Sequence, residues 1–130
     1  MPRGLPRPTD AELAILRVLW ARGPSTVRQV HDALLEARET GYTTTLKLMQ
    51  IMAEKGLVTR DESSRTHIYS TRSSQGQTQR QLVSDLMQRA FGGSATALVL
   101  QALSAQPATV EELQEIQRLI EEYRADRKQS

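Results

Sequence analysis

The sequence predicts a mainly helical protein in which a winged helix-turn-helix, made of three helices and a β-hairpin, precedes an all-α dimerisation domain. Three observations carry this prediction. The first half of the 130-residue chain holds three helical patterns followed by two short β-favouring stretches. The second half holds helical patterns alone. Aromatic residues make up only 4% of the chain, so its cores depend on aliphatic side chains.

The first two helices have clear start and stop signals. Thr9 and Glu12 form a capping box, and Gly23-Pro24 ends the helix that follows it. A second helix is predicted from an N-cap at Ser25 to a point before Gly41. These signals place two short helices in the first third of the chain.

The third helix is predicted over residues 43–55, with Gly56 as its stop. At about 100° per residue, one face is suited to packing and the other is polar. The packing face holds Thr45, Leu48, Met49 and Met52, and the opposite face holds Thr43, Lys47, Gln50 and Glu54. The polar face is therefore free to contact a ligand.

Residues 57–61 and 66–70 favour β-structure and predict a hairpin with Arg65 at its tip. The next segment, 71–79, has no aliphatic residue and is the best candidate for a boundary. We therefore expect a flexible basic arm over residues 1–8, a winged-helix DNA-binding domain over 9–72 and a helical dimerisation domain over 73–130. Residues 1–72 hold 11 Lys and Arg against 8 Asp and Glu, whereas residues 73–130 hold 6 against 7.

The second domain is predicted to contain helices over residues 80–91, 94–104 and 109–126, the last with a capping box at Thr109 and Glu112. These helices are too apolar for a single thin layer to cover, so a partner chain is the simplest cover. The expected dimer contacts are the apolar side chains Leu82, Leu86, Leu98, Leu100, Leu113, Ile116, Ile120 and Tyr123.

A winged helix presents its third helix to the DNA major groove and its hairpin to the backbone. Lys47 can reach guanine acceptors or phosphate, and Gln50 can bind adenine through two hydrogen bonds. The expected DNA-binding residues are Tyr42, Thr43, Thr44, Lys47, Gln50, Arg65, Thr26 and Arg28. Each has a plainer alternative, because the polar face of a helix is often only solvated, and Thr43 would also serve as an N-cap.

Several classes of protein are excluded or disfavoured. The chain has no cysteine and only two histidines, His31 and His67, so we expect no metal site and no cofactor. It has no Gly-x-Ser-x-Gly elbow and no phosphate loop, so an enzyme is not expected. No secretory signal or membrane-length apolar run is present, which predicts a cytoplasmic protein without membrane insertion.

Four stretches of the chain resemble the penicillinase-repressor family of bacterial regulators. They are residues 9–20, 42–58, 65–69 and the Gly92-Gly93 pair before Leu98. The resemblance covers residue 9 to about residue 125, and the family includes the methicillin-resistance repressor and copper-responsive repressors. It implies a homodimer that binds a dyad-symmetric operator and blocks transcription.

In some members of that family, a membrane sensor protease or its downstream signal leads to cleavage of the C-terminal domain. The matching bond here lies between Gln101 and Ala102, where Ala lacks the large side chain that a protease pocket would grip. Copper-responsive members carry paired cysteines near the C-terminus, and this chain has none.

The sequence thus predicts a dimeric repressor that is released from operator DNA by loss of dimerisation, with proteolysis as one route. The alternative is a winged helix that binds a protein and has no sequence-specific affinity for DNA.

Overall fold

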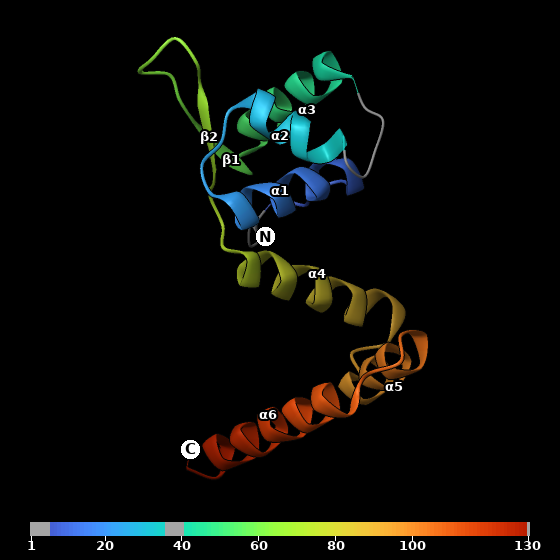
Figure 1. The fold of residues 1–130 in the computed structure, drawn as a ribbon. Helices are drawn as coiled ribbons and strands as arrows, with labels where there is room; N and C mark the ends of the chain where they lie inside the picture. The colour runs from blue at the N-terminus through green and yellow to red at the C-terminus, as the bar shows by residue number, and fades with distance from the viewer. Residues whose placement is uncertain (1–5, 36–40, 130) are drawn as a thin grey trace. The chain divides into compact units, whose positions relative to one another are not determined.

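The computed structural model describes residues 6–35 and 41–129. The chain divides into two compact units, Met1–Asp85 and Leu86–Ser130. The expected domain boundary lies after residue 72, so the first unit continues past that point into a fourth helix. In the first unit, three helices and a hairpin gather around one core (Figure 1).

Helix α1 (Asp10–Arg22) begins and ends where the sequence predicts. The Glu12 N–H donates to Thr9 Oγ1 at 3.2 Å, and the Thr9 N–H donates to Glu12 Oε1 at 2.8 Å. Gly23 follows the helix with a φ of 90°, a conformation that glycine adopts at little cost. The predicted capping box and glycine stop are both confirmed.

Helix α2 (Val27–Leu35) corrects one prediction, because Ser25 is not its N-cap. The Gln29 N–H donates to Thr26 Oγ1 at 3.1 Å, and the Thr26 N–H donates to Gln29 Oε1 at 3.0 Å. Ser25 is buried and exchanges backbone hydrogen bonds with Tyr69 at 3.0 and 2.8 Å. It therefore adds a bridge to the hairpin. The predicted end of this helix falls on residues 36–40, outside the described residues.

Helix α3 (Tyr42–Lys55) ends at Gly56, whose φ of 86° lies in the left-handed region. Strands β1 (Val58–Asp61) and β2 (Ile68–Thr71) then form an antiparallel pair, in which Val58 pairs with Thr71 and Asp61 with Ile68. The predicted hairpin is confirmed. Its connecting loop projects from the helices in Figure 1.

The core of the first unit contains side chains from all three helices and the hairpin. The most deeply buried are Ile15, Val30, Met49, Met52, Val58 and Tyr69. Thr45, Met49 and Met52 come from the face of α3 that the sequence assigned to packing, and Leu48 packs against the same core. The opposite face of α3 remains exposed.

One ion pair joins the start of α1 to the end of α3. Glu12 is 2% exposed, and its Oε1 accepts from Lys55 Nζ at 2.6 Å. Burial raises the pKa of this carboxyl, but hydrogen bonds from Lys55 and from the Thr9 backbone outweigh it, so the pKa lies below its ordinary value of 4.5. The carboxylate form of Glu12 therefore stabilises the folded state.

We expect Glu12→Gln to lower stability at pH 7 by about 1–2 kcal/mol, since the amide keeps the hydrogen bonds and removes the charge. Because the folded pKa lies below 4.5, this contribution is complete above that value and is lost as the pH falls through the folded pKa. Thermal unfolding followed by circular dichroism should show a gap in Tm between parent and variant that narrows below pH 4.5. A gap that stays constant with pH would contradict the assignment.

Helix α4 (Gln75–Ala90) begins earlier than the predicted 80–91 helix, so the polar stretch 71–79 is helical from Gln75 onward. The Gln77 N–H donates to Ser74 Oγ at 3.1 Å, and the Ser74 N–H donates to Gln77 Oε1 at 2.9 Å. Thr78 is buried, and Trp20 Nε1 donates to the Ser73 carbonyl at 3.1 Å. A reciprocal cap and an indole hydrogen bond thus organise a segment that lacks aliphatic side chains.

Arg7, which the sequence assigns to a flexible arm, is held by two contacts in the first unit. Its Nε lies 2.9 Å from Asp85 Oδ2, and its carbonyl accepts from Lys55 Nζ at 3.3 Å. The rest of the expected arm, residues 1–5, lies outside the described residues.

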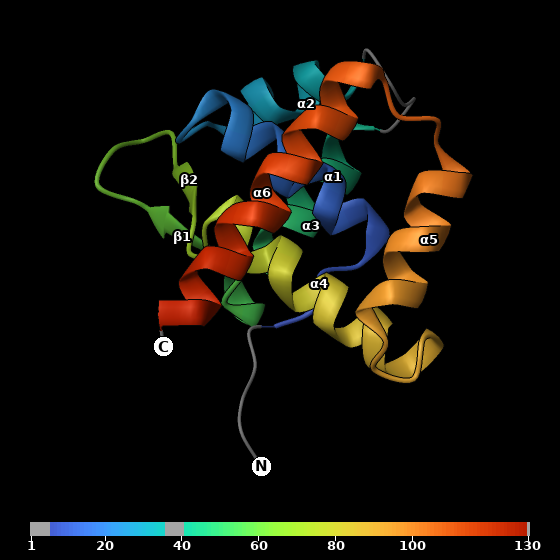
Figure 2. The same ribbon diagram turned by 90° about the horizontal axis from the view of Figure 1, so that it is seen from below.

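The second unit contains α5 (Ala95–Ala105) and α6 (Val110–Gln129), which follow one another across a short connection (Figure 2). Gly92 and Gly93, with φ of 58° and 82°, turn the chain before α5. Thr109 and Glu112 form the predicted second capping box, with distances of 3.0 and 3.2 Å. Among the described side chains of α5 and α6, none is buried within the chain.

Candidate nucleic-acid interface

The first turn of α3 presents exposed polar side chains. Its N-cap is Gly41, whose carbonyl accepts from the Thr45 N–H at 3.1 Å. The alternative role of Thr43 as N-cap is therefore wrong. Thr43 lies within the first turn, where it is exposed together with Tyr42 and Thr44.

Lys47 and Gln50 are exposed farther along the same helix. Met49 and Met52 lie behind them and are completely buried. Ile51 stands at the rim with 36% exposure, as the helical periodicity indicates. A change of Lys47 or Gln50 would therefore leave the core packing of α3 intact.

Tyr42 is held in place by side chains of α2. The Arg28 Cζ lies 4.4 Å from the centroid of the Tyr42 ring, and the His31 ring meets it edge-on at 5.6 Å between centroids. A cation–π contact of this kind contributes about 0.5–1 kcal/mol at an exposed site. The phenol is therefore oriented before any ligand arrives.

His31 of α2 also contacts the start of α3. The His31 side chain is buried, and its Nδ1 lies 3.3 Å from Thr45 Oγ1. The Thr45 hydroxyl donates its one proton to the Gly41 carbonyl at 3.4 Å. Since that proton is already used, the hydrogen-bond pattern assigns the donor role to His31 Nδ1.

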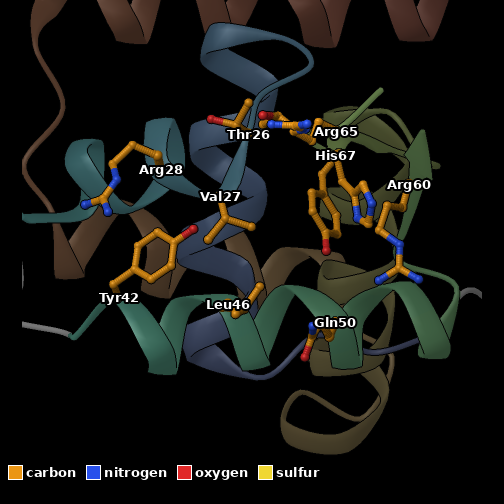
Figure 3. Close-up of a pocket in the computed structure, with 11 residues that line it drawn as sticks. Thr26, Val27, Arg28, Tyr42, Leu46, Gln50, Arg60, Arg65 and His67 are labelled. Atoms are coloured by element: carbon orange, nitrogen blue, oxygen red, sulfur yellow. The ribbon is translucent and has the colours of Figure 1, made fainter. Parts of the chain in front are cut away.

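A groove of about 310 Å³ lies between α2, α3 and the hairpin, and we call it the wing groove (Figure 3). It is lined by Thr26, Val27, Arg28, Tyr42, Leu46, Gln50, Arg60, Arg65, Thr66, His67 and Tyr69.

The wing groove carries positive charge. Arg28, Arg60 and Arg65 contribute three guanidinium groups, and no carboxylate is among the lining residues. Glu62 is the nearby acid, and its Oε2 accepts from Arg60 Nε at 2.8 Å. The Tyr69 hydroxyl and the Glu62 carboxylate both raise the pKa of Arg60, which keeps that side chain protonated. The groove therefore suits an anion.

The wing groove brings together five of the eight expected DNA-binding residues, namely Thr26, Arg28, Tyr42, Gln50 and Arg65. The other three, Thr43, Thr44 and Lys47, are exposed on α3 but do not line the groove. Thr26 also serves as the cap of α2.

Two lining residues, Arg60 and His67, are absent from the sequence-based set. The signal that could have found them is the alternation of side chains along a strand, which places every second residue on one face. Arg60 follows the buried Val58 by two positions, and His67 precedes the buried Tyr69 by two.

In the second part of the chain, the expected dimer contacts are half-buried or exposed. Leu86, Leu100, Leu113, Ile120 and Tyr123 are among the exposed large hydrophobic residues, whereas Leu82, Leu98 and Ile116 are half-buried. Gln101 and Ala102, at the expected cleavage position, are exposed within α5.

Two kinds of feature are absent from the described ranges 6–35 and 41–129, namely a metal-ligand cluster and a membrane-spanning helix. No group of three or more His, Asp or Glu side chains there could hold a metal ion. Among those residues, no helix is both long and apolar enough to cross a bilayer.

Two known proteins are similar to this chain in sequence. The transcriptional regulator BlaI of Mycobacterium tuberculosis strain H37Rv is 43% identical over 67 residues, which cover 51% of this chain and 49% of that protein. The match thus spans about half the length of that relative. The penicillinase repressor of Bacillus licheniformis is 20% identical over 125 residues, which cover 96% of this chain and 98% of that protein.

Two solved structures share the fold. One is the solution structure of the DNA-binding domain of the repressor BlaI, with a TM-score of 0.51, 18% identity, and coverage of 58% of this chain and 93% of that one. The other is monomeric Bacillus licheniformis BlaI in complex with the blaP half-operator, with a TM-score of 0.50, 19% identity, and coverage of 56% and 89%. They support the winged-helix assignment of the first unit. The sequence model of the penicillinase repressor family matches residues 8–122, and this chain belongs to that family.

Proposed function

We propose that this chain is a dimeric transcriptional repressor that binds a dyad-symmetric operator through α3 and the hairpin. The observation that carries the proposal is the wing groove, where three arginines lie beside the exposed face of α3 with no lining carboxylate. Positive charge at this place suits the phosphates of a duplex whose major groove receives α3. The relatives named transcriptional regulator and penicillinase repressor support the same activity.

The residues divide into two roles. Lys47 and Gln50 project from the middle of α3 and read base edges. Tyr42, Thr43 and Thr44 at the start of the helix contact the backbone, as do Arg65 in the hairpin loop and Thr26 and Arg28 at the start of α2. Phosphate contacts fix the register of the protein on the duplex, and base contacts select the sequence.

Dimerisation is assigned to the helical domain over residues 73–130, with Leu82 and Leu86 of α4 contributing beside the side chains of α5 and α6. The described side chains of α5 and α6 include no buried residue, yet both helices carry large aliphatic side chains. A second copy would cover this apolar surface, and each Leu or Ile so buried contributes about 1.5–3 kcal/mol. The symmetry of such a dimer would match an operator with two half-sites.

Induction is the loss of this dimer. Two linked DNA-binding units bind more tightly than one because the second contact is intramolecular. Cleavage between Gln101 and Ala102, by a membrane sensor protease or its downstream signal, is one route that would separate them. The protein would act on DNA in the cytoplasm.

We expect Lys47→Ala and Gln50→Ala each to weaken operator binding without altering thermal stability, because both side chains lie outside the core. A lost base contact costs about 1–3 kcal/mol and relaxes the preference at one base pair. The measurement is a gel-shift titration at fixed salt, on a duplex carrying the inverted repeat expected upstream of the gene.

Arg17→Ala is the matched control, since Arg17 is an exposed cation on α1 outside the wing groove. It should bind like the parent. If both α3 variants also bind like the parent, α3 is not the recognition helix. An affinity that does not fall with salt would favour the alternative of a protein-binding module.

A further inference from the structure

Arg60 and His67 occupy an unusual side of the hairpin. Arg60 pairs across the strands with Tyr69, so these two side chains share one face. Val58 lies two residues before Arg60, and His67 lies two residues before Tyr69, which places both on that same face. Because Val58 and Tyr69 are buried, this is the face turned toward the helices.

Inward-facing positions of a hairpin are ordinarily apolar. Here a guanidinium and an imidazole stand at the end of the inner face, and both line the wing groove together with Gln50 of α3 (Figure 3). Glu62 takes one of the five N–H donors of Arg60, through Nε at 2.8 Å. The Tyr69 hydroxyl also contacts this guanidinium, and the donors of Arg60 that neither group uses can reach a further acceptor in the wing groove.

We propose that Arg60 and His67 form a phosphate-binding site in which the wing groove holds one phosphodiester of a bound duplex. This inference rests on the proposed DNA-binding function and assigns residues that the sequence pattern did not. A planar guanidinium can bind two phosphate oxygens at once. The groove lies between α3 and the hairpin, so a strand that passes beside α3 would place a phosphate there.

The test uses binding of the full-length protein to a fluorescein-labelled duplex of random sequence, followed by anisotropy over a range of salt concentrations. A phosphate contact acts on every sequence alike, so no operator is needed. We expect Arg60→Gln to lower the affinity about tenfold and to reduce the slope of log K against log salt by about 0.9. His67→Gln should lower the affinity in the same direction, by less.

Two further variants separate the site from general effects of charge and folding. Arg17→Gln removes one positive charge from α1 and should leave the slope unchanged. Arg60→Lys keeps the charge and should keep the slope, with a smaller loss of affinity from the missing second hydrogen bond. Thermal unfolding of each variant gives its folded fraction, to which the affinities are corrected.

A slope for Arg60→Gln equal to that of the parent would overturn the inference while the proposed function stood. Equal losses in Arg60→Gln and Arg17→Gln would overturn it as well, because net charge alone would then explain them. If the parent itself binds no duplex in a salt-dependent way, the proposed function fails first.

The same chemistry could serve a free phosphate. Calorimetric titration of the parent with inorganic phosphate at constant ionic strength should therefore show no saturable binding in the micromolar range. Saturable binding that disappears in Arg60→Gln, combined with unchanged affinity for the duplex, would overturn the inference and make the wing groove a small-anion site.

Discussion

Ile120→Glu is expected to convert the protein to a monomer at micromolar concentration and to weaken operator binding by about 10²- to 10⁴-fold. Ile120 is 52% exposed in the single chain, so its replacement disturbs little of the monomer. In the dimer its burial contributes about 1.5–3 kcal/mol, and symmetry doubles the effect. Light scattering measures the dimer, and a gel shift on a two-half-site duplex measures the affinity.

Gln114→Glu is the matched control, because it adds the same charge to α6 on a side away from Ile120. Gln114 is exposed, and Arg118 four residues later is already paired with Glu115 and Glu122, so the added carboxylate remains in solvent. This variant should remain dimeric and bind like the parent. A dimer that survives Ile120→Glu would place the association surface elsewhere than on α6.

The sequence predicted those parts of the fold that depend on local signals. Capping boxes at Thr9 and Thr109 and the glycine after α3 are each set by residues within a few positions of one another. The inward face of α3 follows from helical periodicity alone, and Met49 and Met52 are buried as predicted. Signals within a few residues are sufficient to predict such features, because few alternative local structures compete with them.

The errors in the predicted helix starts occurred where contacts between residues distant in the sequence help to determine the local structure. Ser25 has the side chain of an N-cap, yet Tyr69 draws its backbone into a bridge and leaves the cap to Thr26. The start of α4 was placed too late because two signals set it, a local Ser74–Gln77 cap that was overlooked and a Trp20–Ser73 hydrogen bond across 53 positions that the sequence does not show. Propensity alone cannot foresee such contacts.

The residues of the candidate interface also divide into those that local signals predict and those that depend on contacts between distant parts of the chain. Exposed residues of α3 were found because a single helix determines their face. Arg60 and His67 were missed because their significance depends on which side of the hairpin meets the helices, and this is set by the burial of Val58 and Tyr69. The Arg28 contact with Tyr42 likewise joins two helices.

The structure bears directly on how repression would end. Gln101 and Ala102 are exposed, but both lie within α5 and have helical backbone. A protease binds its substrate in an extended form, so this bond must leave the helix before it can be cut. The small Ala102 side chain also offers little for a protease pocket to hold. Both features make cleavage here slower than at an extended segment with a large side chain.

We therefore expect the repressor from induced cells to be monomeric, whether or not its chain is cut. Cross-linking of cell extracts before and after induction measures the dimer, and mass spectrometry measures the chain. Fragments ending at Gln101 and beginning at Ala102 would support cleavage, whereas full-length protein throughout derepression would exclude it and indicate a ligand or partner. A dimer that persists during derepression would contradict the proposal, because two linked DNA-binding units would retain the affinity that their linkage supplies.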